Sequence, residues 1–352
     1  MASREYSSAA GRAPAAGGAA GVAPGGYLRA EEDPIVVRDL LLLTRAPLAL
    51  SAAANVVTGA LVLRDPAAPW RAEEAGALAL LALASCCAYW AGMVLNDRFD
   101  LERDRALYPD RPLPAGRVSP VTASLLGGGL LVALLALATL AGAALGQGAA
   151  ARGALGAVAL AACILAYDGL LKAERLPGAL AMGACRAANA LLGAFVLGAW
   201  EGPRELGPAL LYALLLGMYV VYLTVLSFYE DEDAPPDAVA TGCLGTTLPP
   251  ALVALATLAG PVRLHPLALV GALPLALVAL AQGFAVIEQG TRARGERTTR
   301  ALLRAIYLLD VALLLGTRHW VAAGAVALAG LVAMAAARLL FAPPPARLDD
   351  AG

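Results

Sequence analysis

The sequence predicts an all-α fold, a polytopic membrane protein built as a bundle of nine or ten transmembrane helices. Three observations support this fold class: a mean hydropathy of +0.70, a hydrophobic fraction of 60%, and a charged fraction of 15% over 352 residues. Several uncharged windows reach about twenty residues, the length that a helix needs to cross the hydrocarbon of a bilayer. A water-soluble domain of this size could not bury so much apolar surface.

The apolar segments follow one another along the chain with short polar connections. They cover 39–63, 75–95, 119–147, 152–170, 178–200, 207–228, 240–260, 264–288, 301–317 and 319–341. The segment 301–317 is short and contains Asp310, so nine and ten crossings both fit the pattern. We expect a disordered tail at 1–33, which is rich in Ala, Gly and Pro and lacks the apolar stretch of a secretory signal. The membrane domain then covers 34–341, and 342–352 form a C-terminal tail.

Lysine and arginine in the short loops predict the orientation of the helices. With a cytoplasmic N-terminus, the loops at 96–118, 171–177, 229–239 and 289–300 lie inside, and they carry about twice as many of these cations as the opposite loops. We therefore expect an integral, multi-pass membrane protein whose N-terminus and acidic loops are cytoplasmic. If the source is a bacterium, the membrane is the plasma membrane.

Charge and metal-ligand counts exclude several other classes of function. The net charge of −1 gives no basis for binding nucleic acid. The five cysteines form no Cys-x-x-Cys pair, and the two histidines, His265 and His319, are far apart in the sequence. A metal site based on cysteine or histidine is therefore not expected.

An acidic cluster follows the second apolar segment, in the stretch NDRFDLERD. Its polar members are Asn96, Asp97, Asp100 and Asp104. If the helix extends through them, this spacing of three and four places the carboxylates on one face, where they repel one another unless they share a cation. Hard oxygen ligands of this kind suit Mg²⁺, which bridges carboxylates to substrate phosphates. The plainer alternative is an acidic helix end neutralised by the neighbouring arginines.

Further polar residues lie in or beside the later apolar segments. Glu230 and Asp233 belong to a second acidic cluster, YEDED, after the sixth segment. Lys172 is the only lysine of the chain, and a lysine is well suited to bind phosphate as a point charge. Arg186 and Asn189 lie three residues apart inside an apolar segment, where an ionisable group usually faces a cavity or a partner.

These motifs resemble those of a known family, the UbiA superfamily of membrane prenyltransferases. The stretch NDRFDLERD followed by RPLPAGRVSP is similar to its first aspartate-rich motif, and all fixed positions match. LTRAPLALSAAANVVTG resembles its first helix, and Tyr167 to Lys172 match a Tyr-x-x-x-x-Lys stretch. The likeness covers roughly 38–317, and Met182 to Asn189 also resemble the EboC-like branch. The second motif departs from the family, which more often has Asp-x-x-x-Asp preceded by another Asp, where this chain has Leu223.

The resemblance implies an integral-membrane, Mg²⁺-dependent prenyltransferase with a central cavity between its helices. It would move an isoprenyl group from an isoprenyl diphosphate to a lipophilic or aromatic acceptor. The implied metal ligands are Asn96, Asp97, Asp100, Asp104, Glu230 and Asp233. The implied diphosphate-binding residues are Arg45, Asn55, Asn96, Arg111, Tyr167, Lys172, Arg186 and Asn189. The implied catalytic residues are Asp97, Asp100, Lys172 and Glu230.

Three alternatives to prenyl transfer stay open at this point. A UbiA-type terpene cyclase would use the same metal site with an internal double bond as the nucleophile. A non-catalytic protein that binds or moves an isoprenoid would agree with the altered second motif. An ion-coupled transporter fits less well, because the acids cluster at one membrane face rather than at the midplane.

Overall fold

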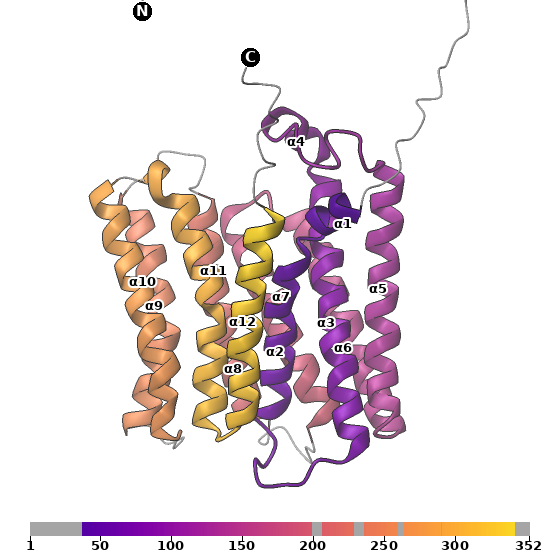
Figure 1. Ribbon diagram of the computed structural model, residues 1–352, viewed down its shortest axis with the longest axis vertical. Coiled ribbons are helices and arrows are strands. Elements are labelled where there is room, and N and C mark those ends of the chain that lie inside the picture. Colours follow the sequence, from indigo (N-terminus) through magenta and orange to yellow (C-terminus); the bar gives the residue numbers. More distant parts are fainter. Residues whose placement is uncertain (1–36, 199–205, 229–235, 260–263, 290, 342–352) are drawn as a thin grey trace, which may run out of the picture. The chain divides into compact units, whose positions relative to one another are not determined.

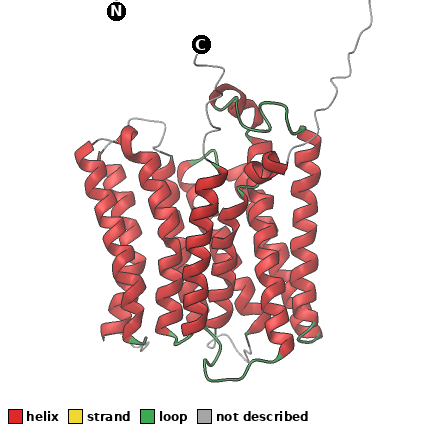
Figure 2. Ribbon diagram, viewed as in Figure 1, coloured by secondary structure: helices red, strands yellow, loops and turns green. Residues whose placement is uncertain are grey.

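The computed structural model describes residues 37–198, 206–228, 236–259, 264–289 and 291–341. Every regular element in these ranges is a helix, and the described residues belong to one unit (Figures 1 and 2). The prediction of an all-α membrane bundle is therefore confirmed. The proposed boundaries of the two tails fall outside the described residues and stay predictions.

The long helices lie alongside one another, and the short helices α1 and α4 lie at the end of the bundle where α3 finishes (Figure 1). In chain order the helices are α1 (Val37–Leu43), α2 (Ala49–Leu61), α3 (Ala72–Phe99), α4 (Leu101–Leu107), α5 (Pro120–Ala143), α6 (Gln147–Ala166), α7 (Arg175–Leu197), α8 (Gly207–Ser227), α9 (Pro236–Ala259), α10 (Leu269–Gln289), α11 (Thr291–Gly316) and α12 (Trp320–Leu340).

Eight described helices are long and apolar enough to cross a membrane, and the bent pair α1–α2 makes a ninth candidate span. Helix α11 was expected as one of the spans and lies within the bundle beside α12 (Figure 1). It is not among the candidates, because its first turns are rich in arginine. The described residues thus contain nine candidate spans when the bent pair α1–α2 is counted as one span.

The bend between α1 and α2 is 46° and contains a short 3-10 turn, Ala46–Leu48. Arg45 begins this turn in the left-handed conformation, with a φ of 48°. A non-glycine residue in this conformation costs of order 1–3 kcal/mol and persists where the surroundings hold it in place. The bend directs the Arg45 side chain toward the end of α3, where it contacts Asp97.

Helices α2 and α7 approach each other closely because glycine occupies the crossing on both sides. A Cβ atom at Gly59 would lie 2.0 Å from the main-chain oxygen of Ala190, and one at Gly193 would lie 2.1 Å from that of Val56. Small residues are the usual means of close helix packing in membranes, where the hydrophobic effect gives no preference for helix over lipid. Across this crossing, Arg186 on α7 donates to the Asn55 side chain on α2, and Asn189 on α7 donates to the main-chain oxygen of Ala52.

Substitution of Gly193 by alanine tests this packing. We expect Gly193→Ala to lower the free energy of unfolding by about 1–3 kcal/mol, because α2 and α7 must move apart. Gly128→Ala on α5 is the matched control, since a Cβ there meets no atom within 4 Å. Thermal unfolding followed by circular dichroism in detergent measures both. Equal midpoints for the two variants would show that the crossing does not need glycine.

Candidate active site

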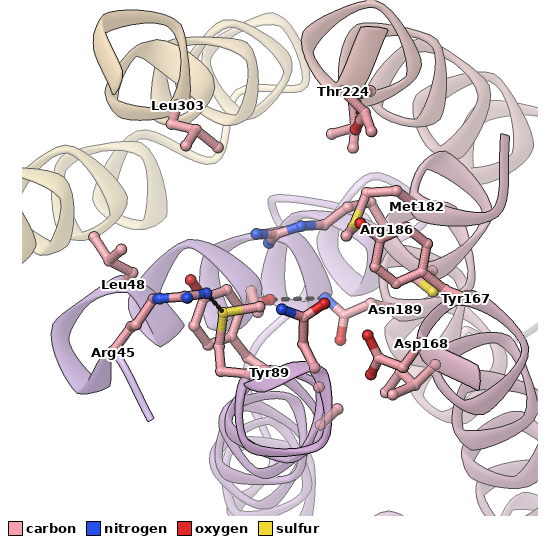
Figure 3. Close-up of a pocket in the computed structure, with 18 of the residues that line it drawn as sticks. Arg45, Leu48, Tyr89, Tyr167, Asp168, Met182, Arg186, Asn189, Thr224 and Leu303 are labelled. Carbon is pink, nitrogen blue, oxygen red and sulfur yellow. Dashed lines mark hydrogen bonds between the residues drawn. The ribbon is translucent and has the colours of Figure 1, made fainter. Parts of the chain in front are cut away.

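A cavity of about 490 Å³ lies between the helices on the side where α3 ends (Figure 3). Its walls come from α2, α3, α6, α7, α8 and α11 and are mostly apolar. The larger polar and charged side chains that line it are Arg45, Tyr89, Asn96, Arg111, Tyr167, Asp168, Arg186 and Asn189. An apolar cavity with a few polar groups is the usual form of a site for a small molecule or a lipid.

Asp97 lies on the last turn of α3 and is 4% exposed. Its Oδ1 atom forms a salt bridge with the Arg45 guanidinium at 3.2 Å. The two residues come from segments that are far apart in the sequence. The ion pair therefore ties the bend between α1 and α2 to the acidic end of α3.

Asp100 is paired with a different cation, Lys172. The Nζ atom of Lys172 lies 2.7 Å from Asp100 Oδ1 and donates at 3.3 Å to both the main-chain and the side-chain oxygen of Asn96. Lys172 directly follows a π-helical turn, Tyr167–Leu171, that continues α6. The single lysine of the chain thus lies against the first acidic motif, and its role in binding diphosphate stays a prediction.

Asp104 pairs with a third cation. Arg111 Nη1 donates to Asp104 Oδ2 at 2.6 Å, and the guanidinium carbon lies 3.9 Å from the centre of the Tyr108 ring. Asp104 belongs to α4 and is 4% exposed, while Arg111 also lines the cavity. The Arg-Pro-Leu-Pro segment after α4 therefore folds back over the acidic motif.

The three aspartates do not lie on one uninterrupted helix. Helix α3 ends at Phe99, α4 begins at Leu101, and Asp100 lies between them with a ψ of 6°. Among the described residues, no group of three or more Asp, Glu, His or Cys side chains is gathered in a way that could hold a metal ion. Glu230 and Asp233, the predicted ligands of the second motif, lie outside the described residues.

The donor set at the end of α3 nevertheless fits Mg²⁺ in its chemistry. Mg²⁺ keeps several waters and is usually bound through one or two carboxylates plus the phosphates of a substrate. Asp97 and Asp100 supply two carboxylates close to the cavity, and Asn96 adds an amide oxygen on its wall. A cluster of three protein carboxylates is not required for such a site.

Arg186 lies deeper in the bundle, in the middle of α7. Its Nη1 atom donates to Ser51 Oγ at 3.2 Å and to Asn55 Oδ1 at 3.1 Å. Asn55 in turn donates through Nδ2 to both carboxylate oxygens of Asp310, at 3.2 and 2.9 Å. The Tyr212 hydroxyl also donates to Asp310. Arg186 is thus connected to a buried carboxylate through one intervening amide.

The side chains of Asn55 and Asn189 form hydrogen bonds between helices in the interior of the bundle. Asn55 is fully buried and does not line the cavity, although the sequence predicts it as a diphosphate contact. Asn189 is 4% exposed, accepts from Ser85 Oγ at 2.6 Å and donates to the main-chain oxygen of Ala52 at 2.9 Å. We therefore expect Asn55 to position Arg186 rather than to touch substrate.

Two buried carboxylates, Asp168 and Asp310, had no role assigned to them from the sequence. Asp310 is fully buried, and Asp168 is 3% exposed and lines the cavity beside Tyr167 (Figure 3). The available signal was an acid within or directly beside an apolar helix, which is rare without a partner or a function.

The sequence is similar to a family of known proteins and to two curated relatives. The sequence model of the UbiA prenyltransferase family matches residues 52–299. A digeranylgeranylglyceryl phosphate synthase from Ignicoccus hospitalis is 30% identical over 167 residues, which cover 47% of this chain and 50% of the relative. Another from Methanopyrus kandleri is 39% identical over 93 residues, 26% of this chain and 32% of the relative. The chain thus spans half or less of the length of these curated relatives.

Solved structures share the fold. A UbiA homolog from Aeropyrum pernix K1 has a TM-score of 0.60 at 20% identity and covers 76% of this chain and 96% of its own. A UbiA homolog from Archaeoglobus fulgidus bound to GPP and Mg²⁺ has a TM-score of 0.52 at 14% identity and covers 77% and 99%. The likeness to the EboC-like branch stays a prediction. Because the family model covers more than half of the chain, the protein belongs to the UbiA prenyltransferase family.

Proposed function

We propose that the protein is a Mg²⁺-dependent prenyltransferase that moves an isoprenyl group from its diphosphate to a lipophilic acceptor. The observation that carries this proposal is the set of three ion pairs at the end of α3, next to an apolar cavity. This arrangement offers a charged region for a diphosphate and an apolar space for the chain attached to it. Family membership and the structure of a homolog bound to GPP and Mg²⁺ support the same function.

The proposed diphosphate site uses the cations that now bind the acidic motif. Lys172, Arg45 and Arg111 each contact one carboxylate, and all three can turn toward an anion at the mouth of the cavity. Asp97, Asp100 and Asn96 would hold Mg²⁺, with Asp104, Glu230 and Asp233 as further ligands predicted from sequence. The bound metal would neutralise charge that develops on the leaving diphosphate. Tyr167 lines the adjacent wall, where it can bind the same group.

The apolar part of the cavity has the second role in this proposal. It would hold the isoprenyl chain and exclude water from the carbon that loses diphosphate. The acceptor would bind beside this carbon. Arg186 lines the inner part of the cavity, where its positive charge can contact the acceptor. The named activity of the relatives suggests a lipid-like glyceryl phosphate as one acceptor, while an aromatic acceptor stays the alternative.

The orientation of the protein is part of the proposal. We infer that the N-terminus and the end of α3 face the cytoplasm, because the arginine-rich loops lie on that side. The diphosphate would then reach its site from the compartment where soluble diphosphates and Mg²⁺ are abundant. The membrane domain is proposed to cover 34–341.

Diphosphate release by the full chain in lipid vesicles tests the function. With geranylgeranyl diphosphate, Mg²⁺ and a glyceryl-phosphate lipid as acceptor in the vesicles, we expect release that falls roughly 100-fold or more in an Asp97→Asn, Asp100→Asn double variant, because transition-state charge is no longer stabilised. Glu102→Gln is the control, since Glu102 lies in the same segment but pairs with Arg105 at the surface. Lipid-extract analysis then separates transfer from cyclisation. Tight Mg²⁺-dependent binding without release would contradict an enzymatic role.

Lys172 gives a second prediction on the donor. We expect Lys172→Met to lose about 1.5–3 kcal/mol of charge-assisted hydrogen bonding to the diphosphate, a weakening of roughly 10- to 100-fold in Kd. Lys172→Arg keeps the charge and should recover part of the affinity. Mg²⁺-dependent binding of a radiolabelled donor to vesicles measures all three proteins. Unchanged affinity in Lys172→Met would remove this residue from the site.

A further inference from the structure

Asp168 is a carboxylate with an unusual environment. It is 3% exposed, yet its Oδ2 atom is buried without a hydrogen-bond partner in the described part of the chain. A buried polar atom without a partner is unfavourable by roughly 1–3 kcal/mol, and such atoms in native proteins usually serve a function. The carboxyl group is therefore held in a state that a bound molecule can improve.

Asp168 lies in an unusual stretch of backbone. Tyr167–Leu171 form a π-helical turn, closed by a hydrogen bond of 3.0 Å from the Lys172 amide to the Tyr167 carbonyl. Such turns are rare overall but frequent at functional sites. Figure 3 shows the Asp168 carboxyl group pointing from its helix into the cavity, on the side of Asn189.

No other described carboxylate lines this cavity. Asp97, Asp100 and Asp104 are each engaged by a cation and are not part of its wall. The wall from α8 includes Leu223, which is 3% exposed and has no group that accepts a proton. The described wall also contains no histidine, so Asp168 is its one strong proton acceptor.

Asp168 lies between the charged end of the cavity and its apolar part, so both substrates of the proposed reaction would bind near it. It lies four residues before Lys172, which marks the diphosphate end, and in the same wall as Leu160 and Ile164, which belong to the apolar space. In the proposed function, the reacting carbon meets the acceptor near this boundary, within reach of the Asp168 carboxylate. Hydroxyl groups of aliphatic alcohols are weak nucleophiles until a base removes their proton.

We propose that Asp168 is the general base of prenyl transfer and that the acceptor is a lipid alcohol. The inference rests on the proposed function. In the step, the acceptor oxygen forms a bond with C1 of the isoprenyl group, and the bond between C1 and the diphosphate oxygen breaks with its electron pair on diphosphate. The proton of the acceptor hydroxyl moves to the Asp168 carboxylate. No oxidant or further reactant is needed.

Asp168→Asn keeps the shape of the side chain and removes the base. With geranylgeranyl diphosphate, Mg²⁺ and a monoalkylglycerol phosphate as acceptor, we expect kcat for transfer to fall by roughly 10²- to 10⁴-fold, the usual contribution of a general base. Mg²⁺-dependent binding of the donor should stay within about twofold of wild type, since a base does not hold the donor. Asp110→Asn, an exposed acid in the loop after α4, is the matched control.

A sulfur analogue of the acceptor separates a base from a structural role. A thiol loses its proton near pH 8.5 without help, so the deficit of Asp168→Asn should shrink to about tenfold or less with the thiol acceptor. An equal deficit with alcohol and thiol would overturn the inference and indicate a structural role. Loss of Mg²⁺-dependent donor binding in Asp168→Asn would overturn it in favour of a metal ligand.

The proposed function and this inference can fail separately. Normal transfer by Asp168→Asn to the alcohol would overturn the base and leave prenyl transfer standing. Diphosphate release by the wild type without transfer to either glycerol acceptor would overturn the lipid-alcohol class. Absence of both release and donor binding in the wild type would overturn the proposed function itself.

Discussion

Pairing of charge at the edge of the membrane is the constraint on which this structure depends. Carboxylates near a hydrocarbon phase are costly to leave unpaired, because removing them from water is strongly unfavourable. Asp97, Asp100 and Asp104 each take one cation. Those cations come from three separate segments: the bend after α1, the π turn after α6, and the loop after α4. The acidic end of α3 therefore organises the backbone around it.

In the proposed function, the same pairing places cations where a charged substrate would bind. Each cation already lies beside the acidic motif, so it would need to move only a short distance to contact a diphosphate. Preorganisation of this kind lowers the cost of ordering charged groups when a ligand binds.

A second polar network holds the interior. The amide of Asn55 donates to Asp310 and accepts from Arg186, so both of its ends are fixed by what they contact. The network connects α2, α7, α8 and α11. Within it, the positive charge of Arg186 and the carboxylate of Asp310 are joined through Asn55 and do not contact each other directly. Glycine at the crossing of α2 and α7 makes this connection possible. Arg186 thus presents its charge to the cavity from a defined position, while the mouth uses a separate set of cations.

The sequence by itself determined the membrane bundle, the acidic motif at the end of the second long helix, and Lys172 as the single lysine of the chain and a candidate for binding phosphate. These features are local: hydropathy over twenty residues, spacing of carboxylates, and a single residue type are readable without knowing what packs against them. The tertiary structure alone decided that Arg45 pairs with Asp97 across 52 residues and that Asn55 bonds Asp310 across 255. It also ended α3 at Phe99 and placed Asp168 in a π turn at the wall of the cavity. Such choices depend on how helices rotate, bend and cross, which is set by packing between segments that are distant in the chain.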